Sequence, residues 1–167
     1  NMRKITLTVL LLSALSFFAQ AQEKTFSISG KIELDKGNLL VLTQRPGKID
    51  TLAKTAIANR QFSISGTTEE AVVAQLVIEG YAGGFVMILE PGEEYTANLT
   101  QNGNGDIRGG KLQTAYNEYQ KIVVNANAES RALNKKASEA AAQKHFKTSK
   151  ELQTKANKVQ EAAFAKM

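Results

Sequence analysis

The sequence predicts a mainly β N-terminal region, an antiparallel β-sandwich or barrel of about seven or eight short strands, followed by a C-terminal α-helical segment. Over residues 26–107, apolar and polar residues alternate, which is the period of a strand with one buried face. Turn-forming pairs such as Pro91-Gly92 separate these runs at short intervals. After Gly109-Gly110 the apolar spacing becomes three and four residues, which indicates helices.

The N-terminus has the layout of a secretory signal peptide. Arg3 and Lys4 precede an apolar run, and Ala19–Ala21 supplies the small residues that a signal peptidase reads. The run spans about 14 residues, whereas a membrane-spanning helix needs about 20. We therefore expect that residues 1–21 are removed after export and that no membrane anchor remains.

One pentapeptide, Phe-Ser-Ile-Ser-Gly, occurs twice in the β-region, at Phe26–Gly30 and at Phe62–Gly66. In each copy, the Phe and Ile side chains share one face of an extended chain and the two Ser side chains share the other. This is the pattern of a half-buried strand. Beyond the pentapeptide the two copies diverge, so we interpret them as two strands of one sheet and not as a duplicated domain.

The other strand-like runs are short and either alternating or β-branched. In chain order they read NLLVLTQ, IDTLAKTAIANRQ, AVVAQLVIEG and FVMILEPGEEYTANLT. We assign residues 22–110 to one β-domain.

The helical segment, residues 111–167, carries two thin apolar stripes that are rich in Ala. The first stripe includes Leu112, Tyr116, Tyr119 and Ala126, and the second includes Ala142, Phe146, Ser149, Leu152, Ala156, Val159 and Ala163. We expect a helical hairpin whose turn lies within Asn125–Asn134, where the pattern is weakest. No Gly cap or Pro stop follows the second stripe, so we expect a truncated linker that continues into a further domain.

The composition excludes several classes of site. The chain has no Cys, so it has no disulfide framework, no thiolate metal site and no thiol nucleophile. Its one His is His145, which excludes metal sites built from several His side chains. We therefore expect no catalytic residue, no metal and no cofactor in this chain.

Charge is distributed unevenly along the sequence. Residues 22–110 hold 8 basic and 11 acidic residues, whereas residues 111–167 hold 11 basic and 5 acidic ones. A basic half can indicate nucleic-acid binding. Here the Lys residues are spread along a helix among Glu, Gln and Asn, so we interpret them as a solvated helix face. We expect no nucleic-acid partner.

Two motifs have the outline of a ligand-binding loop. Arg108–Lys111 reads Arg-Gly-Gly-Lys before a helix, but the spacing of a phosphate-binding loop fails, so we interpret the glycines as a hinge. Asn102, Asn104 and Asp106 alternate as in a calcium loop, but the Gly and the acidic residue that complete such a loop are missing. We expect a turn there.

Three further candidates also have structural explanations. Glu90, Glu93 and Glu94 flank the Pro-Gly turn and could pair for acid–base chemistry, although carboxylates at turns are commonly exposed. His145 lies among Lys residues of the helical segment, where we expect it to face solvent. Gly80–Phe85 has the flexibility of a binding loop, but it also suits a simple connection between two strands, which we favour.

The succession of motifs resembles a known family. The most telling pieces are FSISG, ILEPGEEY at Ile88–Tyr95 and GGKLQTAYNEY at Gly109–Tyr119, within a region from about Thr25 to Lys121. Together they resemble a domain of unknown function found at the front of secreted thioredoxin-like proteins. Those proteins belong to the peroxiredoxin and thiol-disulfide interchange group of Gram-negative bacteria.

In that family a helical segment follows, and then a thioredoxin fold that carries a Cys-x-x-Cys pair. The resemblance implies a non-catalytic accessory domain of an exported thiol-disulfide oxidoreductase in the periplasm or cell envelope. It would position the redox domain or recognise its client, so its partners would be a thioredoxin-like domain in cis and a client protein. The alternative is a free-standing binding or adhesion module of the cell envelope that uses the Gly80–Phe85 loop or a sheet face.

Overall fold

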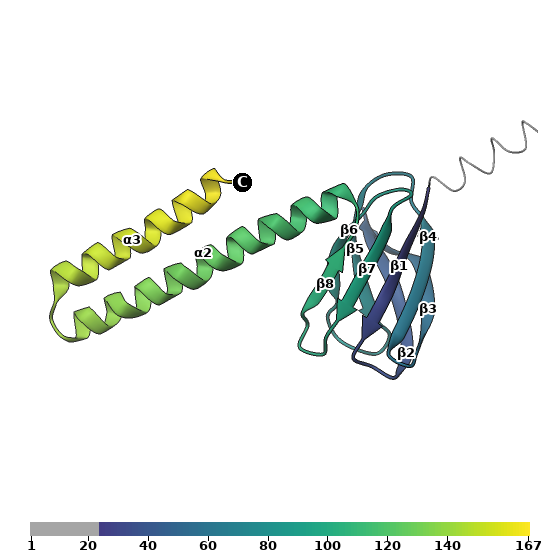
Figure 1. Ribbon diagram of the computed structural model, residues 1–167, viewed down its shortest axis with the longest axis horizontal. Helices are drawn as coiled ribbons and strands as arrows, with labels where there is room; N and C mark the ends of the chain where they lie inside the picture. The colour runs from purple at the N-terminus through teal and green to yellow at the C-terminus, as the bar shows by residue number, and fades with distance from the viewer. Residues whose placement is uncertain (1–23) are drawn as a thin grey trace, which may run out of the picture. The chain divides into compact units, whose positions relative to one another are not determined.

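The computed structural model describes residues 24–167, which form two compact units (Figure 1). The first unit ends at Thr114, and the second runs from Ala115 to Met167. The expected signal peptide, residues 1–21, lies outside the described residues.

The first unit contains one sheet and the beginning of a long helix. Its strands are β1 (Thr25–Ile32), β2 (Lys36–Arg45), β3 (Lys48–Ala58), β4 (Gln61–Thr67), β5 (Val72–Ile78), β6 (Phe85–Leu89), β7 (Glu94–Leu99) and β8 (Gly105–Arg108). Two helices follow, α2 (Lys111–Ala142) and α3 (Phe146–Ala165). The predicted order, a β-region followed by a helical hairpin, is confirmed.

The eight-stranded sheet is mixed and nearly closed into a barrel (Figure 1). Its strand order is β6-β5-β2-β3-β4-β1-β7-β8, and the pairs are antiparallel except β1 and β7, which are parallel. The two edge strands, β6 and β8, approach each other: a Cβ atom on Gly105 of β8 would lie 2.8 Å from the ring of Phe85 in β6. A barrel was among the predicted folds, whereas the parallel pair was not predicted.

The two copies of the repeated pentapeptide pair with each other. Strands β1 and β4 run antiparallel, so that Ile28 lies opposite Ile64, and the Phe of each copy lies opposite the Gly of the other. The glycine makes room for the aromatic ring, since a Cβ atom on Gly66 would lie 2.7 Å from the ring of Phe26. The Phe and Ile side chains of both copies are buried, which confirms the predicted alternation.

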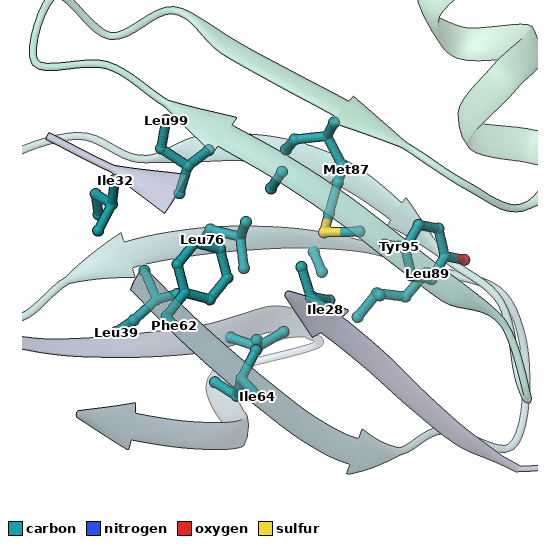
Figure 2. Close-up of a cluster of buried hydrophobic side chains, with 14 of the residues drawn as sticks. Ile28, Ile32, Leu39, Phe62, Ile64, Leu76, Met87, Leu89, Tyr95 and Leu99 are labelled. Atoms are coloured by element: carbon teal, nitrogen blue, oxygen red, sulfur yellow. The ribbon is translucent and has the colours of Figure 1, made fainter. Parts of the chain in front are cut away.

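The core lies inside the barrel, where each strand contributes at least one buried apolar side chain (Figure 2). Its members are Phe26, Ile28, Ile32, Leu39, Val41, Ile57, Phe62, Ile64, Ala74, Leu76, Met87, Leu89, Tyr95, Ala97, Leu99 and Ile107. The members within each strand are mostly two residues apart, as the period of an extended chain requires.

The second unit is a helical hairpin with a seam of small residues. Ala126 and Ala137 of α2 and Ser149, Ala156 and Ala163 of α3 are buried. The Gln160 side-chain amide of α3 donates a hydrogen bond to the Asn127 side-chain oxygen of α2 over 3.0 Å. Within residues 24–167, no helix combines the length and the apolar character that crossing a bilayer requires.

The turn of the hairpin lies later in the chain than the sequence predicted. Helix α2 continues through Asn125–Asn134 and ends at Ala142, and Lys144 in the connection has a φ of +63°. The expected position was wrong because Asn125–Asn134 holds no Gly or Pro, and its Ala, Glu, Arg and Leu residues favour a continuous helix. In the expected second stripe, Phe146 is exposed at 68% and does not belong to the seam.

Replacing one buried and one exposed residue of the second pentapeptide tests the alternation. The Phe62 side chain is buried in the core, so Phe62→Ala should lower the free energy of unfolding by about 3–5 kcal/mol. Ser63 faces outward, so Ser63→Ala should change it by no more than about 0.5 kcal/mol. Urea melts of both variants provide the measurement, and equal destabilisation would contradict the assignment of the two faces.

Candidate functional site

The connections between strands gather at two ends of the barrel. We call the end that contains the β6–β7 turn and Gly109-Gly110 the helix end, because α2 begins there. Since successive strands run back and forth between the ends, the β5–β6 connection and the β7–β8 connection lie at the opposite end, which we call the loop end. The sequence candidates of the β-region divide between these two ends, and His145 lies in the helical unit.

At the helix end, two of the three most telling sequence motifs, Ile88–Tyr95 and Gly109–Tyr119, contact each other. Gly110 has a φ of +64°, and a Cβ atom there would lie 2.6 Å from the Glu90 carboxylate and 2.9 Å from the Tyr95 hydroxyl. Gly109 has a φ of +124°, and a Cβ atom there would overlap the carbonyl oxygen of Glu94. Both positions therefore require glycine, because a side chain would be strained and would push the β6–β7 turn away.

The Glu90 carboxylate accepts a hydrogen bond from the N-terminus of α2. Its Oε2 atom accepts a hydrogen bond from the main-chain N–H of Leu112 over 2.9 Å. The first turn of α2 contains no acidic residue of its own, so Glu90 supplies the negative charge that a helix N-terminus favours. At the N-terminus of α2, where a phosphate-binding motif would hold a phosphate, the structure has the Glu90 carboxylate of the same chain. The two glycines of Arg108–Lys111 form the connection from β8 to α2, as the sequence predicted.

Side chains, rather than a neighbouring strand, bind the free edge of β6. Gln113, which is only 1% exposed, accepts a hydrogen bond from the main-chain N–H of Ile88 through Oε1 over 2.7 Å. The Tyr95 hydroxyl accepts one from the N–H of Glu90 over 2.8 Å. These two N–H groups are two residues apart and therefore point to the same side of the strand. The first turn of α2 thus closes part of the seam between β6 and β8.

Burial of the Tyr95 side chain raises the pKa of its hydroxyl above the ordinary value. The carboxylates of Glu90 and Glu93 raise this pKa further, while the hydrogen bond from the N–H of Glu90 lowers it. The hydroxyl therefore stays protonated in the folded state at a pH where an exposed Tyr begins to ionise.

At the loop end, a pocket with a volume of about 310 Å³ opens between three connections. Its lining residues come from the β1–β2 connection, the β5–β6 connection, the β7–β8 connection and the adjoining strand ends. They are Ile32, Glu33, Leu34, Ile78, Tyr81, Ala82, Gly83, Gly84, Phe85, Thr100, Gln101 and Gly103. Most of these residues are apolar or glycine, and Glu33 is the charged one among them.

The Gly80–Phe85 segment contains the connection between two strands that its sequence favoured. It connects β5 to β6, with positive φ angles at Gly80 and Gly83 and a hydrogen bond from the Tyr81 N–H to the Ile78 carbonyl over 3.1 Å. It also forms one wall of the pocket. The Tyr81 side chain is 61% exposed beside the opening.

Hydrogen bonds hold Glu33 in place at the rim of this pocket. The Gln101 main-chain N–H donates to the Glu33 Oε2 atom over 2.8 Å, and the Gln101 side-chain amide donates to the Glu33 carbonyl over 2.9 Å. The Glu33 N–H donates to the Leu99 carbonyl over 3.1 Å. Three contacts therefore fix the backbone and the carboxylate of Glu33 together.

The remaining sequence candidates have structural roles. Asn102 accepts a hydrogen bond from the N–H of Asn104 over 3.1 Å and also bonds to the Thr100 hydroxyl, as in a turn. Asp106 pairs with Arg108 over 3.0 Å. His145 is exposed in the connection between the helices. Within residues 24–167, no three His, Cys, Asp or Glu side chains group closely enough to hold a metal ion.

Sequence reasoning assigned no role to Gln113 or Glu33. Gln113 stands in the first turn of α2, but its hydrogen bond to Ile88 joins residues 25 apart in the chain, so no local pattern marks this role. No local signal marks Glu33, since its partners Leu99 and Gln101 lie more than sixty residues away in the chain.

Replacing Gln113 tests the seam between β6 and the helix. Gln113→Ala leaves the part-buried N–H of Ile88 without its acceptor, so the free energy of unfolding should fall by about 1–3 kcal/mol. The matched control is Gln153→Ala on the exposed face of α3, which should change it by no more than about 0.5 kcal/mol. Chemical denaturation would contradict this role of Gln113 if the two variants melted alike.

Stability at alkaline pH tests the environment of Tyr95. Because the pKa of Tyr95 is raised in the folded state, the Tyr95 hydroxyl of the unfolded chain loses its proton at a lower pH than that of the folded chain. The stabilisation that the protonated hydroxyl provides is therefore complete below pH about 10 and is lost as pH rises through the folded-state pKa. Tyr95→Phe removes this loss, although it also leaves the N–H of Glu90 without its acceptor at every pH. The stability difference between wild type and variant should therefore shrink above pH about 10. A constant difference in denaturation experiments across that range would contradict a raised pKa.

Comparison with known proteins identifies a family for the region that contains the barrel and the start of α2. No curated protein matches the sequence. One similar solved structure is a 9R-lipoxygenase from Cyanothece PCC8801, at 14% identity and a TM-score of 0.29, where the match covers 53% of this chain and 13% of that one. This TM-score does not establish a shared fold.

The family model described as a domain of unknown function, DUF4369, matches residues 26–116. The match includes the barrel, both pentapeptide copies and the motifs that meet at the helix end. Because it covers more than half of the sequence, this chain belongs to the DUF4369 family.

Proposed function

We propose that this chain is the non-catalytic N-terminal accessory domain of an exported thiol-disulfide oxidoreductase. In this role it positions the redox domain or recognises its client, in the periplasm or cell envelope of a Gram-negative bacterium. A thioredoxin-like domain would follow in cis. The support for this finer assignment is the resemblance of its motifs to the front of secreted thioredoxin-like proteins.

The observation that carries the proposal is the attachment of α2 to the barrel. Glu90 binds the first turn of the helix, and Gln113 from that turn binds the edge of β6. The two glycines before the helix cannot be replaced without strain, because a Cβ atom at either one would contact Tyr95 and either Glu90 or Glu94. A helix whose first turn is fixed in this way suits a module that is joined at a defined point to the chain after it.

The absence of Cys from the sequence supports a role without redox chemistry in this part of the protein. Disulfide exchange requires a thiolate, and residues 1–167 supply none. The helical hairpin leaves Phe146 and Phe164 exposed at 68% and 70%, which suits contact with a further part of the protein.

The second candidate function is a free-standing binding or adhesion module of the cell envelope. The observation in its favour is the loop-end pocket, which the Gly80–Phe85 segment helps to form. This candidate requires no downstream domain, so the two functions differ in what the gene encodes next.

Reading the gene beyond the codon for Met167 tests the proposal. We expect a downstream thioredoxin-like region with a Cys-x-x-Cys pair. A stop codon directly after Met167 would contradict an accessory domain in cis and would favour the free-standing module.

Insulin reduction provides the matching biochemical comparison. Purified residues 22–167 should show no turnover, because they lack a thiol, whereas the longer product with its Cys pair should reduce insulin. Turnover by residues 22–167 above the buffer rate would contradict the non-catalytic assignment.

A further inference from the structure

We propose that the loop-end pocket binds an extended peptide in which a Lys or Arg adjoins an aromatic or large aliphatic residue. The inference deepens the client-recognition part of the proposed function and rests on it. It names the site on the barrel and the chemistry of the segment that the site accepts.

The size and the walls of the pocket suit one large apolar side chain. Its volume of about 310 Å³ is at the lower limit of small-ligand sites, which commonly measure about 300–1,000 Å³. Ile32 is buried beneath it, and Ile78 and Phe85 are partly buried against the core, so the floor is apolar. The exposed ring of Tyr81 at the opening can contact an aromatic side chain that enters.

The charge at the rim favours a cation next to that side chain. Glu33 is the charged residue of the lining, and none of the ion pairs among residues 24–167 involves it. The neighbouring acidic residues differ in this respect, because Asp35 pairs with Arg60 over 3.1 Å and Glu79 pairs with Lys54 over 2.9 Å. Glu33 thus offers a carboxylate that is fixed by Gln101 and that forms no ion pair with a Lys or Arg of the described residues.

Glycine in the lining gives a peptide main chain access to the pocket. A Cβ atom added to Gly83 or Gly103 would meet nothing within 4 Å, so the space beside both residues is open. These two glycines lie on different connections that line the same pocket, so no side chain at either position obstructs a peptide that crosses it. A peptide is therefore favoured over a compact amine that would use the apolar floor and Glu33 alone.

Tryptophan fluorescence provides a direct binding assay, because the chain itself contains no Trp. The probe is an end-blocked peptide, Gly-Trp-Lys-Gly, titrated with purified residues 22–167. Its matched control has Gln in place of Lys, and tryptamine supplies the indole and the ammonium group without a peptide chain. We expect saturable binding of the Lys peptide, weaker binding of the Gln peptide and weaker binding of tryptamine.

Two variants locate the site. Glu33→Gln keeps an oxygen that can accept from the Gln101 N–H, so the fold should persist while the Lys peptide binds about two- to five-fold more weakly and the Gln peptide binds unchanged. Tyr81→Ala should weaken both peptides by about two- to ten-fold. Glu70→Gln, an exposed carboxylate in the β4–β5 connection at the helix end, is the matched control and should leave both affinities unchanged.

The outcomes separate this inference from the proposed function. Equal binding of both peptides, or an equal loss with Glu33→Gln and Glu70→Gln, would overturn the assignment of Glu33. If tryptamine bound as tightly as the Lys peptide, the proposal that the pocket recognises a peptide would be overturned, and the pocket would instead be a site for amphipathic amines. If no peptide binds while the gene encodes a downstream Cys-x-x-Cys pair, the pocket inference fails and the accessory-domain proposal stands.

Discussion

The close approach of β1 to β7 at Gly30 is the constraint on which the rest of the barrel depends. A Cβ atom at Gly30 would overlap the carbonyl oxygen of Ala97, so a side chain there would force the parallel strands apart. Strand β1 pairs with β4 on its other edge and thereby joins the larger part of the sheet to β7 and β8. Because β8 leads directly into α2, the place where the helix begins also depends on this contact.

Glycine within strands has a second use in this barrel, as a partner for aromatic rings. Phe26 lies opposite Gly66 across the β1–β4 pair, and the ring of Phe85 lies where a Cβ atom of Gly105 would be. The first contact fills the core between paired strands, and the second covers part of the seam between strands that do not pair. Glycine usually weakens a strand, but here its missing side chain provides the volume that a neighbouring ring occupies. The repeated pentapeptide carries both a Phe and a Gly, so in the antiparallel β1–β4 pair the Phe of each copy lies opposite the Gly of the other.

Local patterns were sufficient to predict the strands and the two helices, because the period of burial is a property of neighbouring residues. The alternation around Phe62 and the turn at Pro91-Gly92 both correspond to the structure. The parallel β1–β7 pair was beyond prediction, because it depends on contacts between residues far apart in the chain. The hairpin turn was misplaced because the true turn at residues 143–145 contains no Gly or Pro either. The Gly80–Phe85 connection was predicted from its composition, whereas the pocket beside it depends on Glu33 and Gln101 from two other connections.

The two ends of the barrel differ in how their polar groups are used. At the helix end, the polar side chains bind main-chain N–H groups of the fold. The Glu90 carboxylate binds the N-terminus of α2, and the Tyr95 hydroxyl and Gln113 bind the edge of β6. A ligand there would have to displace hydrogen bonds that hold the fold, so these residues favour a structural role. At the loop end, one main-chain N–H binds the Glu33 carboxylate, and the glycines beside it have open space. Recognition of another molecule therefore conflicts least with stability at the loop end.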